Sequence, residues 1–199
     1  MSLHFTKLRE GDRTAPLLTI KNLSVRVGIR QVLKGMSLTI CQGEHIRITG
    51  PNGSGKSTLL NAIAGVEPAR IEEGTIEFDG SDIRSMPPHK RASLGIAYMR
   101  QTDNIFPSLS VGENLRLALG EYGPERFMKV FPECAKDLPL SKTAGLLSGG
   151  QKKKLAWGMT LLRQNARIAL LDELKAGTDE SINGNQIPGH LTVLEVEHA

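Results

Sequence analysis

The segment at residues 50–57 limits the folds open to this chain more than any other feature of its sequence. It satisfies the pattern GxxxxGK followed by Ser or Thr, with the residues Gly50, Pro51, Asn52, Gly53, Ser54, Gly55, Lys56 and Ser57. Such glycines let successive backbone N–H groups turn toward phosphate oxygens, and a helix starting after the loop adds its positive end. Lys56 then reaches the β- and γ-phosphates, and the Ser57 hydroxyl binds Mg²⁺. The sequence therefore predicts a nucleoside triphosphate site that also includes Thr58, and an incidental glycine-rich turn is the disfavoured alternative.

The patterns around the loop predict an α/β fold. A strand at residues 45–49 runs into the loop, and apolar spacing predicts a helix at 57–66 directly after it. Further strands alternate with helices, which indicates a mostly parallel sheet with helices on both faces. These strands are predicted at residues 95–99, 168–171 and 192–196. Two N-terminal antiparallel edge strands are predicted at residues 17–27 and 36–40, separated by glycines.

We predict one domain over residues 1–199, with a helical subdomain inserted into its core. Two capping-box patterns, Ser110 with Glu113 and Ser148 with Gln151, each start a helix. The first of these helices is predicted at residues 111–119. The predicted divisions are an N-terminal tail at 1–16, a core at 17–101 and 155–199, and the helical subdomain at 102–154.

Charge and hydropathy narrow the functional classes. The net charge is +4, yet the basic residues are spread along the chain with one tight run, residues 152–154, which we interpret as a solvated helix face. A nucleic-acid partner is therefore not expected. The apolar runs are far shorter than the roughly 18 residues of a membrane-spanning helix, and the N-terminus lacks the apolar core of a secretory signal. These observations predict a cytoplasmic protein.

A second chemical element follows the strand at residues 168–171. Asp172 and Glu173 lie at its carboxyl end, the edge where open α/β sheets bind ligands. We predict that Asp172 holds Mg²⁺ and that Glu173 polarises the attacking water as general base. Without the phosphate loop, an ordinary solvent-exposed strand end would be the favoured interpretation.

The sequence Leu-Ser-Gly-Gly-Gln at residues 147–151 resembles the signature of ABC ATPases. The resemblance extends from Leu17 to the C-terminal histidine and implies ATP and Mg²⁺ as ligands. It also implies a head-to-tail dimer, formed with a second copy or a related ATP-binding subunit. In that dimer, one subunit's signature contacts the γ-phosphate bound to the other. The residues implied in this contact are Ser148, Gly149, Gly150 and Gln151.

The resemblance assigns three further positions. Gln101 fits the glutamine that touches Mg²⁺ or the attacking water, Asp179 fits a loop at the dimer interface, and His198 fits a histidine that holds the γ-phosphate. Their alternatives are a strand cap, a turn start and a frayed terminus, respectively.

The sequence departs from the family pattern at the base-binding position and near the C-terminus. Val27 stands where an aromatic residue usually stacks on adenine, which predicts weaker or less base-selective binding. Leu174 replaces the usual proline, and a helix usually inserted between Asp179 and His198 is missing.

The resemblance implies an ATPase that powers a transporter through transmembrane permease subunits on the inner face of the membrane. Residues 131–133 and 193–198 are most similar to those in ATPases of branched-chain amino-acid importers. The alternatives are a non-hydrolysing regulatory subunit and an ABC-type ATPase that acts on nucleic acid or the ribosome.

Overall fold

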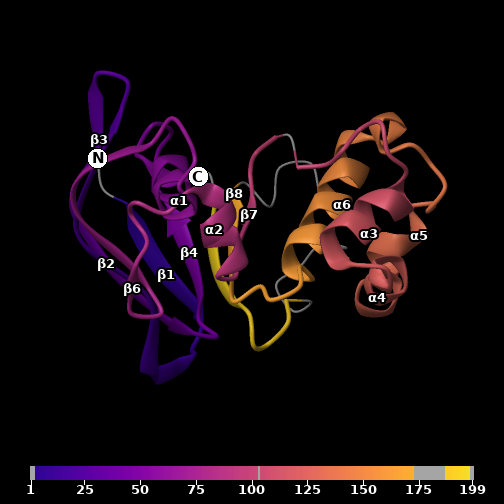
Figure 1. The fold of residues 1–199 in the computed structure, drawn as a ribbon, viewed down its shortest axis with the longest axis horizontal. Helices are drawn as coiled ribbons and strands as arrows, with labels where there is room; N and C mark the ends of the chain where they lie inside the picture. Colours follow the sequence, from indigo (N-terminus) through magenta and orange to yellow (C-terminus); the bar gives the residue numbers. More distant parts are fainter. Residues whose placement is uncertain (1–2, 103, 173–186, 198–199) are drawn as a thin grey trace.

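The computed structural model describes residues 3–102, 104–172 and 187–197. Figure 1 shows the strands gathered on one side of the molecule and four helices, α3 to α6, on the other. The strands form two sheets, and the phosphate-loop segment lies within the strand-rich part. Each helix in the described ranges is too short or too polar to cross a membrane.

The central sheet has five strands in the order β1-β4-β9-β8-β7. Strands β4, β9, β8 and β7 run parallel, and β1 pairs antiparallel with β4 at one edge. The bounds are β1 His4–Arg9, β4 His45–Thr49, β9 Thr192–Val196, β8 Ile168–Asp172 and β7 Ile96–Met99. Strands β8 and β9 are buried throughout, as expected for inner parallel strands.

The second sheet is antiparallel, in the order β3-β2-β5-β6. Helix α1 contacts strands of both sheets and therefore lies between them, while the short helix α2 contacts α1 and β7. The bounds are β3 Arg30–Gln42, β2 Asp12–Val27, β5 Arg70–Phe78, β6 Ser81–Asp82, α1 Lys56–Ala64 and α2 Pro88–Ser93.

The helical part packs around aromatic side chains. Trp157 is fully buried, with its ring centroid 4.5 Å from that of Phe131, which in turn lies 5.7 Å from Phe127. Both predicted capping boxes are present at the starts of α3 and α6. The bounds are α3 Val111–Leu119, α4 Gly123–Val130, α5 Pro132–Lys136, the 3₁₀ turn η1 Ala144–Leu146 and α6 Gly149–Leu161.

Alternation along β8 divides the apolar side chains between two cores. Ile168 and Leu170 belong to the core around α1, whereas Ala169 and Leu171 belong to the core that contains Trp157. Successive residues of a strand point to opposite faces, so the central sheet is covered on both. The predicted α/β class is confirmed, and the predicted N-terminal antiparallel strands lie in β2 and β3 of the second sheet.

Four details of the prediction are wrong. The segment at 1–16 is not a tail, because it supplies β1 and the start of β2. Strand β2 is an inner strand, paired with both β3 and β5, and not an edge strand. Helix α6 continues through Leu161 and crosses the expected subdomain boundary at 154. The run at 152–154 is not a fully solvated face, since Lys154 is buried and its Nζ lies 2.7 Å from Asp137 Oδ2.

Candidate functional site

The phosphate-loop segment joins the end of β4 to the start of α1 and requires glycine at Gly55. Gly53 and Gly55 have φ angles of 75° and 102°, a region that residues with a Cβ atom rarely adopt. A Cβ atom at Gly55 would also lie 2.6 Å from Leu33 Cδ2 on β3. The loop is therefore seated directly against the β2–β3 hairpin.

Lys56 places a positive charge inside the loop. Its side chain is buried, and Nζ donates to the carbonyl oxygens of Gly50 at 2.5 Å and Pro51 at 3.1 Å. Helix α1 begins at Lys56 with no side-chain cap, so the amides of its first turn point toward the loop. A helix end with free amides and an adjacent ammonium attracts an anion.

Ser54 adds an unsatisfied hydroxyl to this loop. Among the described residues its buried Oγ has no hydrogen-bond partner. A buried hydroxyl without a partner is costly, and a ligand with acceptor oxygens would satisfy it. The loop thus fits a phosphate chain in charge and in hydrogen-bonding capacity.

Ser57 and Asp172 connect the loop to the carboxyl end of β8. Ser57 Oγ donates to Asp172 Oδ1 at 3.1 Å, although 115 residues separate them in sequence. Asp172 is 5% exposed. Burial raises the pKa of the neighbouring Tyr98, and the negative charge of Asp172 raises it further. A hydroxyl and a carboxylate side by side are the oxygen ligands that Mg²⁺ prefers, so the donor set fits this ion.

A cavity of about 270 Å³ adjoins the loop. Val27, predicted at the base-binding position, lines it together with Arg30 and Val32 of β3. The remaining lining residues belong to the loop and the first turn of α1: Gly53, Ser54, Gly55, Lys56, Ser57 and Thr58. The prediction missed Arg30 and Val32, although their places just after the Gly28-Ile29 turn could have indicated them.

Gln101 follows β7 at the same edge of the sheet as Asp172. Met99 pairs with Leu171 in parallel register, so both strands end side by side. The Gln101 side chain is exposed there. Its predicted contact with Mg²⁺ or water remains a prediction.

The signature segment opens α6 in the helical part, on the opposite side of the molecule from α1 in Figure 1. Ser148 Oγ accepts from the Gln151 amide at 3.3 Å, and Gln151 Oε1 accepts from the Ser148 amide at 3.0 Å. A Cβ atom at Gly149 would meet no heavy atom within 4 Å, so this helix start is open to solvent. Within one chain the signature and the phosphate loop are therefore separate surfaces.

Three predicted residues, Glu173, Asp179 and His198, lie outside the described residues. Their roles as general base, interface residue and γ-phosphate ligand remain predictions.

The fold and the site define the class of this protein: an ATP-binding cassette, a phosphate-loop ATPase domain with attached helices. The chain belongs to the ABC transporter family, because the family model described as "ABC transporter" matches residues 33–176. The matched range includes the loop, the signature and Asp172.

Curated relatives are ATP-binding proteins with several different cargoes in their names. The chain is 36% identical to "Probable branched-chain amino acid transport ATP-binding protein LivF" of Archaeoglobus fulgidus, covering 77% of this chain and 67% of that protein. It is 33% identical to "Fe(3+) ions import ATP-binding protein FbpC" of Streptomyces avermitilis, with 83% and 48% covered. For "Lipopolysaccharide export system ATP-binding protein LptB" of Haemophilus influenzae the identity is 34%, with 82% and 69% covered. The chain thus spans between about half and two thirds of the length of these relatives.

Solved structures share the fold. A nucleotide-free ATP-binding cassette from an ABC transporter matches with a TM-score of 0.72 at 28% identity, covering 92% of this chain and 81% of that one. A bacterial Atm1-family ABC exporter with ATP bound matches with a TM-score of 0.76 at 24% identity, covering 94% and 35%. The second likeness concerns the fold alone.

Proposed function

We propose that this chain is the ATP-binding and ATP-hydrolysing subunit of an ABC membrane transporter. The observation that carries the proposal is the 3.1 Å hydrogen bond from Ser57 Oγ to Asp172 Oδ1. It brings the phosphate loop and the acidic strand end to one edge of the sheet, where triphosphate and metal must meet for phosphoryl transfer. Family membership supports the same function.

In this proposal the loop amides and Lys56 hold the β- and γ-phosphates of ATP. Lys56 exchanges its two carbonyl partners for phosphate oxygens, and the α1 N-terminus stabilises their negative charge. Ser57 and Asp172 would hold Mg²⁺, which when bound neutralises charge developing on the phosphates. Glu173, next after Asp172 in sequence, is proposed as the base that orients the attacking water, with Gln101 and His198 beside the γ-phosphate.

The open start of α6 supports a head-to-tail dimer. The signature at Ser148 and Gly149 is exposed, and it opens α6 on the opposite side of the molecule from α1 (Figure 1). In this proposal one nucleotide is therefore held by the loop of one subunit and the signature of another. Two copies, or this chain and a related subunit, would each supply a loop to the other's signature. Asp179 is proposed at that interface.

Turnover of Mg-ATP by the purified chain tests this proposal. We expect Asp172→Asn to lower the hydrolysis rate about 10- to 100-fold, since perturbing a metal site typically costs this much. Asp79→Asn is a matched control, because Asp79 is an exposed aspartate paired with Arg167 at 2.7 Å away from the loop. Glu173→Gln should keep ATP binding and abolish turnover. Equal rates for Asp172→Asn and the parent would refute the assignment.

The same assay addresses the alternative functions. ATP binding without turnover, with transmembrane subunits present, would favour a non-hydrolysing regulatory subunit. Stimulation of turnover by nucleic acid or ribosomes would favour an ATPase acting on those partners.

For the cargo, we propose branched-chain amino-acid import, on the likeness to the LivF protein at 36% identity. The transmembrane permease subunits would hold the chain at the inner face of the membrane. Because other relatives are named for Fe(3+) ions and lipopolysaccharide, uptake of labelled leucine into cells with and without the gene is the deciding measurement. Equal uptake in both strains would contradict this cargo.

A further inference from the structure

The tip of the β2–β3 hairpin presents three side chains to the cavity beside the phosphate loop. Val27 and Arg30 are direct cross-strand partners on either side of the turn, so their side chains lie on one face of the hairpin. Val32, two positions after Arg30, lines the same cavity. Gly55 packs against Val32 and Leu33, which fixes this wall relative to the loop.

The hairpin residues that line this cavity offer a guanidinium but no aromatic ring. Arg30 is exposed, and within the described parts of the chain its guanidinium has no recorded hydrogen bond or ion pair. The nearby Arg26 differs, because it donates to Glu72 Oε1 at 2.5 Å and to the Ile29 carbonyl at 2.8 Å. Arg30 is thus a planar cation at the mouth of the cavity, available to a ligand.

We infer that Arg30 is the nucleobase platform of this protein, with its guanidinium stacked on the base and Val27 and Val32 in contact with the nucleoside. The inference rests on the proposed function, because it needs a triphosphate held at the loop. The nucleoside of that triphosphate must occupy a volume next to the loop. The cavity at Ser57 and Thr58 adjoins the first turn of α1, where the phosphates would bind.

The chemistry of the platform predicts weak base selectivity. A guanidinium plane stacks on the π face of any base and does not read the pattern of donors and acceptors on its edge. The two valines add only apolar contact. We therefore expect ATP and GTP to bind with affinities within about threefold of each other, because stacking of this kind is tolerant of base identity.

A second cavity is the alternative binding place for the nucleobase. It has a volume of about 560 Å³, shares Arg30, Val32, Gly53 and Ser54 with the first, and is also lined by Phe5 of β1. Phe5 is 37% exposed and is the aromatic residue among the side chains that line these two cavities. If the base stacked on Phe5, Phe5→Ala would weaken nucleotide binding.

The test compares dissociation constants for Mg-ATP, Mg-GTP and inorganic tripolyphosphate, which has no base. Arg30→Ala should weaken ATP and GTP by about 5- to 10-fold, a change typical of a lost base stack, and leave tripolyphosphate within twofold. Arg30→Lys keeps the charge without the plane and should lose most of the same affinity. Lys21→Ala is the control: it removes a cation of β2 that is paired with Glu77 of β5, and it should leave all three constants unchanged.

Three results would overturn the inference. Equal weakening of tripolyphosphate would assign Arg30 to the phosphates, full ATP affinity in Arg30→Ala would remove its role, and weakening by Phe5→Ala would move the base to the second cavity. Failure of the parent protein to bind either tripolyphosphate or ATP would instead overturn the proposed function itself. Circular dichroism of each variant separates lost binding from lost folding.

Discussion

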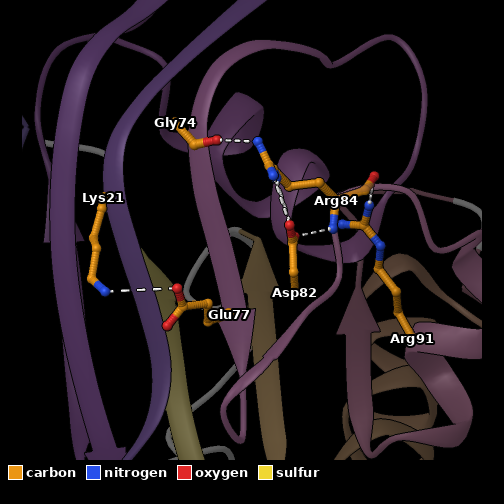
Figure 2. A network of polar contacts seen from close by, with 6 residues as sticks. All are labelled: Lys21, Gly74, Glu77, Asp82, Arg84 and Arg91. Atoms are coloured by element: carbon orange, nitrogen blue, oxygen red, sulfur yellow. Dashed lines mark hydrogen bonds and ion pairs between the residues drawn. The ribbon is translucent and has the colours of Figure 1, made fainter.

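Arg91 on α2 anchors the end of α1 that lies opposite the phosphate loop, and replacing it should destabilise the whole strand-rich part. Arg91 is 3% exposed, and its guanidinium donates to four backbone carbonyls. Two of these, Ala62 at 2.6 Å and Ile63 at 2.9 Å, are in the last turn of α1. The others, Met86 and Arg84, each at 2.8 Å, belong to the segment before α2, and Figure 2 shows Arg91 beside Arg84.

The expected cost of Arg91→Met follows from these bonds. A hydrogen bond from a charged donor contributes roughly 1.5–3 kcal/mol, so four would give about 6–12 kcal/mol before desolvation is subtracted. Burial removes water from the guanidinium and so lowers the pKa of Arg91, and the charge of Asp82 only partly opposes this shift. Arg91→Met would leave these buried carbonyls without their donor, at about 1–3 kcal/mol for each unsatisfied group, and after partial relaxation we expect a net loss of about 3–5 kcal/mol.

Urea denaturation followed by far-ultraviolet circular dichroism measures this loss. Lys90→Met is the matched control, because Lys90 is the exposed neighbouring cation on the same helix, and its free energy of unfolding should change by less than about 0.5 kcal/mol. Arg91→Lys should be intermediate, since one ammonium cannot span four carbonyls. Equal stability of Arg91→Met and Lys90→Met would refute the anchoring role.

Two further predictions concern the other core and the central sheet. Gly158→Ala should lower the free energy of unfolding by about 1–3 kcal/mol through overpacking, because the new Cβ would lie 2.0 Å from Phe127 Cε2. Gly149→Ala has open space, so it should keep full stability but lower ATPase turnover. Unfolding followed by fluorescence of the single tryptophan measures stability, and the ATPase assay measures turnover. Burial raises the pKa of Glu195, but hydrogen bonds from the basic side chains of β4 outweigh burial and leave the pKa below its usual value of 4.5. The ionised Glu195 therefore stabilises the fold above pH 4.5, and this contribution is lost as the pH falls through the lower folded-state pKa. Glu195→Gln should be less stable than the parent at pH 7, and its free energy of unfolding should fall less between pH 6 and pH 3 in urea titrations. Equal pH dependence of the two proteins would contradict this.

Local sequence signals predicted the elements of this fold well where the signal was itself local. The strands at 45–49 and 192–196 and the helix at 111–119 have the predicted bounds, because apolar pattern and a capping box act over a few residues. The adjacency of the loop and Asp172 was also predicted, because both follow parallel strands whose carboxyl ends share one edge.

Features that depend on distant pairing were not predicted. The segment at 4–9 has many charged and polar residues, and it is a strand only because β4 offers it an edge. Its Lys7 pairs with Glu44 at 2.5 Å, a contact across 37 residues that no local pattern encodes. The turn before Arg30 is a local signal, but the place of Arg30 in the cavity depends on the hairpin register and on the packing of the phosphate loop against the hairpin.

The two ends of α1 explain why a short helix can serve both the core and the site. At its carboxyl end the carbonyls that carry the negative end of the helix dipole are met by the Arg91 guanidinium. At its amino end no side chain caps the amides, so the positive end remains available to phosphate. Because Arg91 anchors the carboxyl end of the helix whose amino end faces the phosphates, Arg91→Met should weaken ATP binding as well as folding. A variant that unfolds more easily but binds Mg-ATP with parental affinity in its folded state would separate the two effects and contradict this coupling.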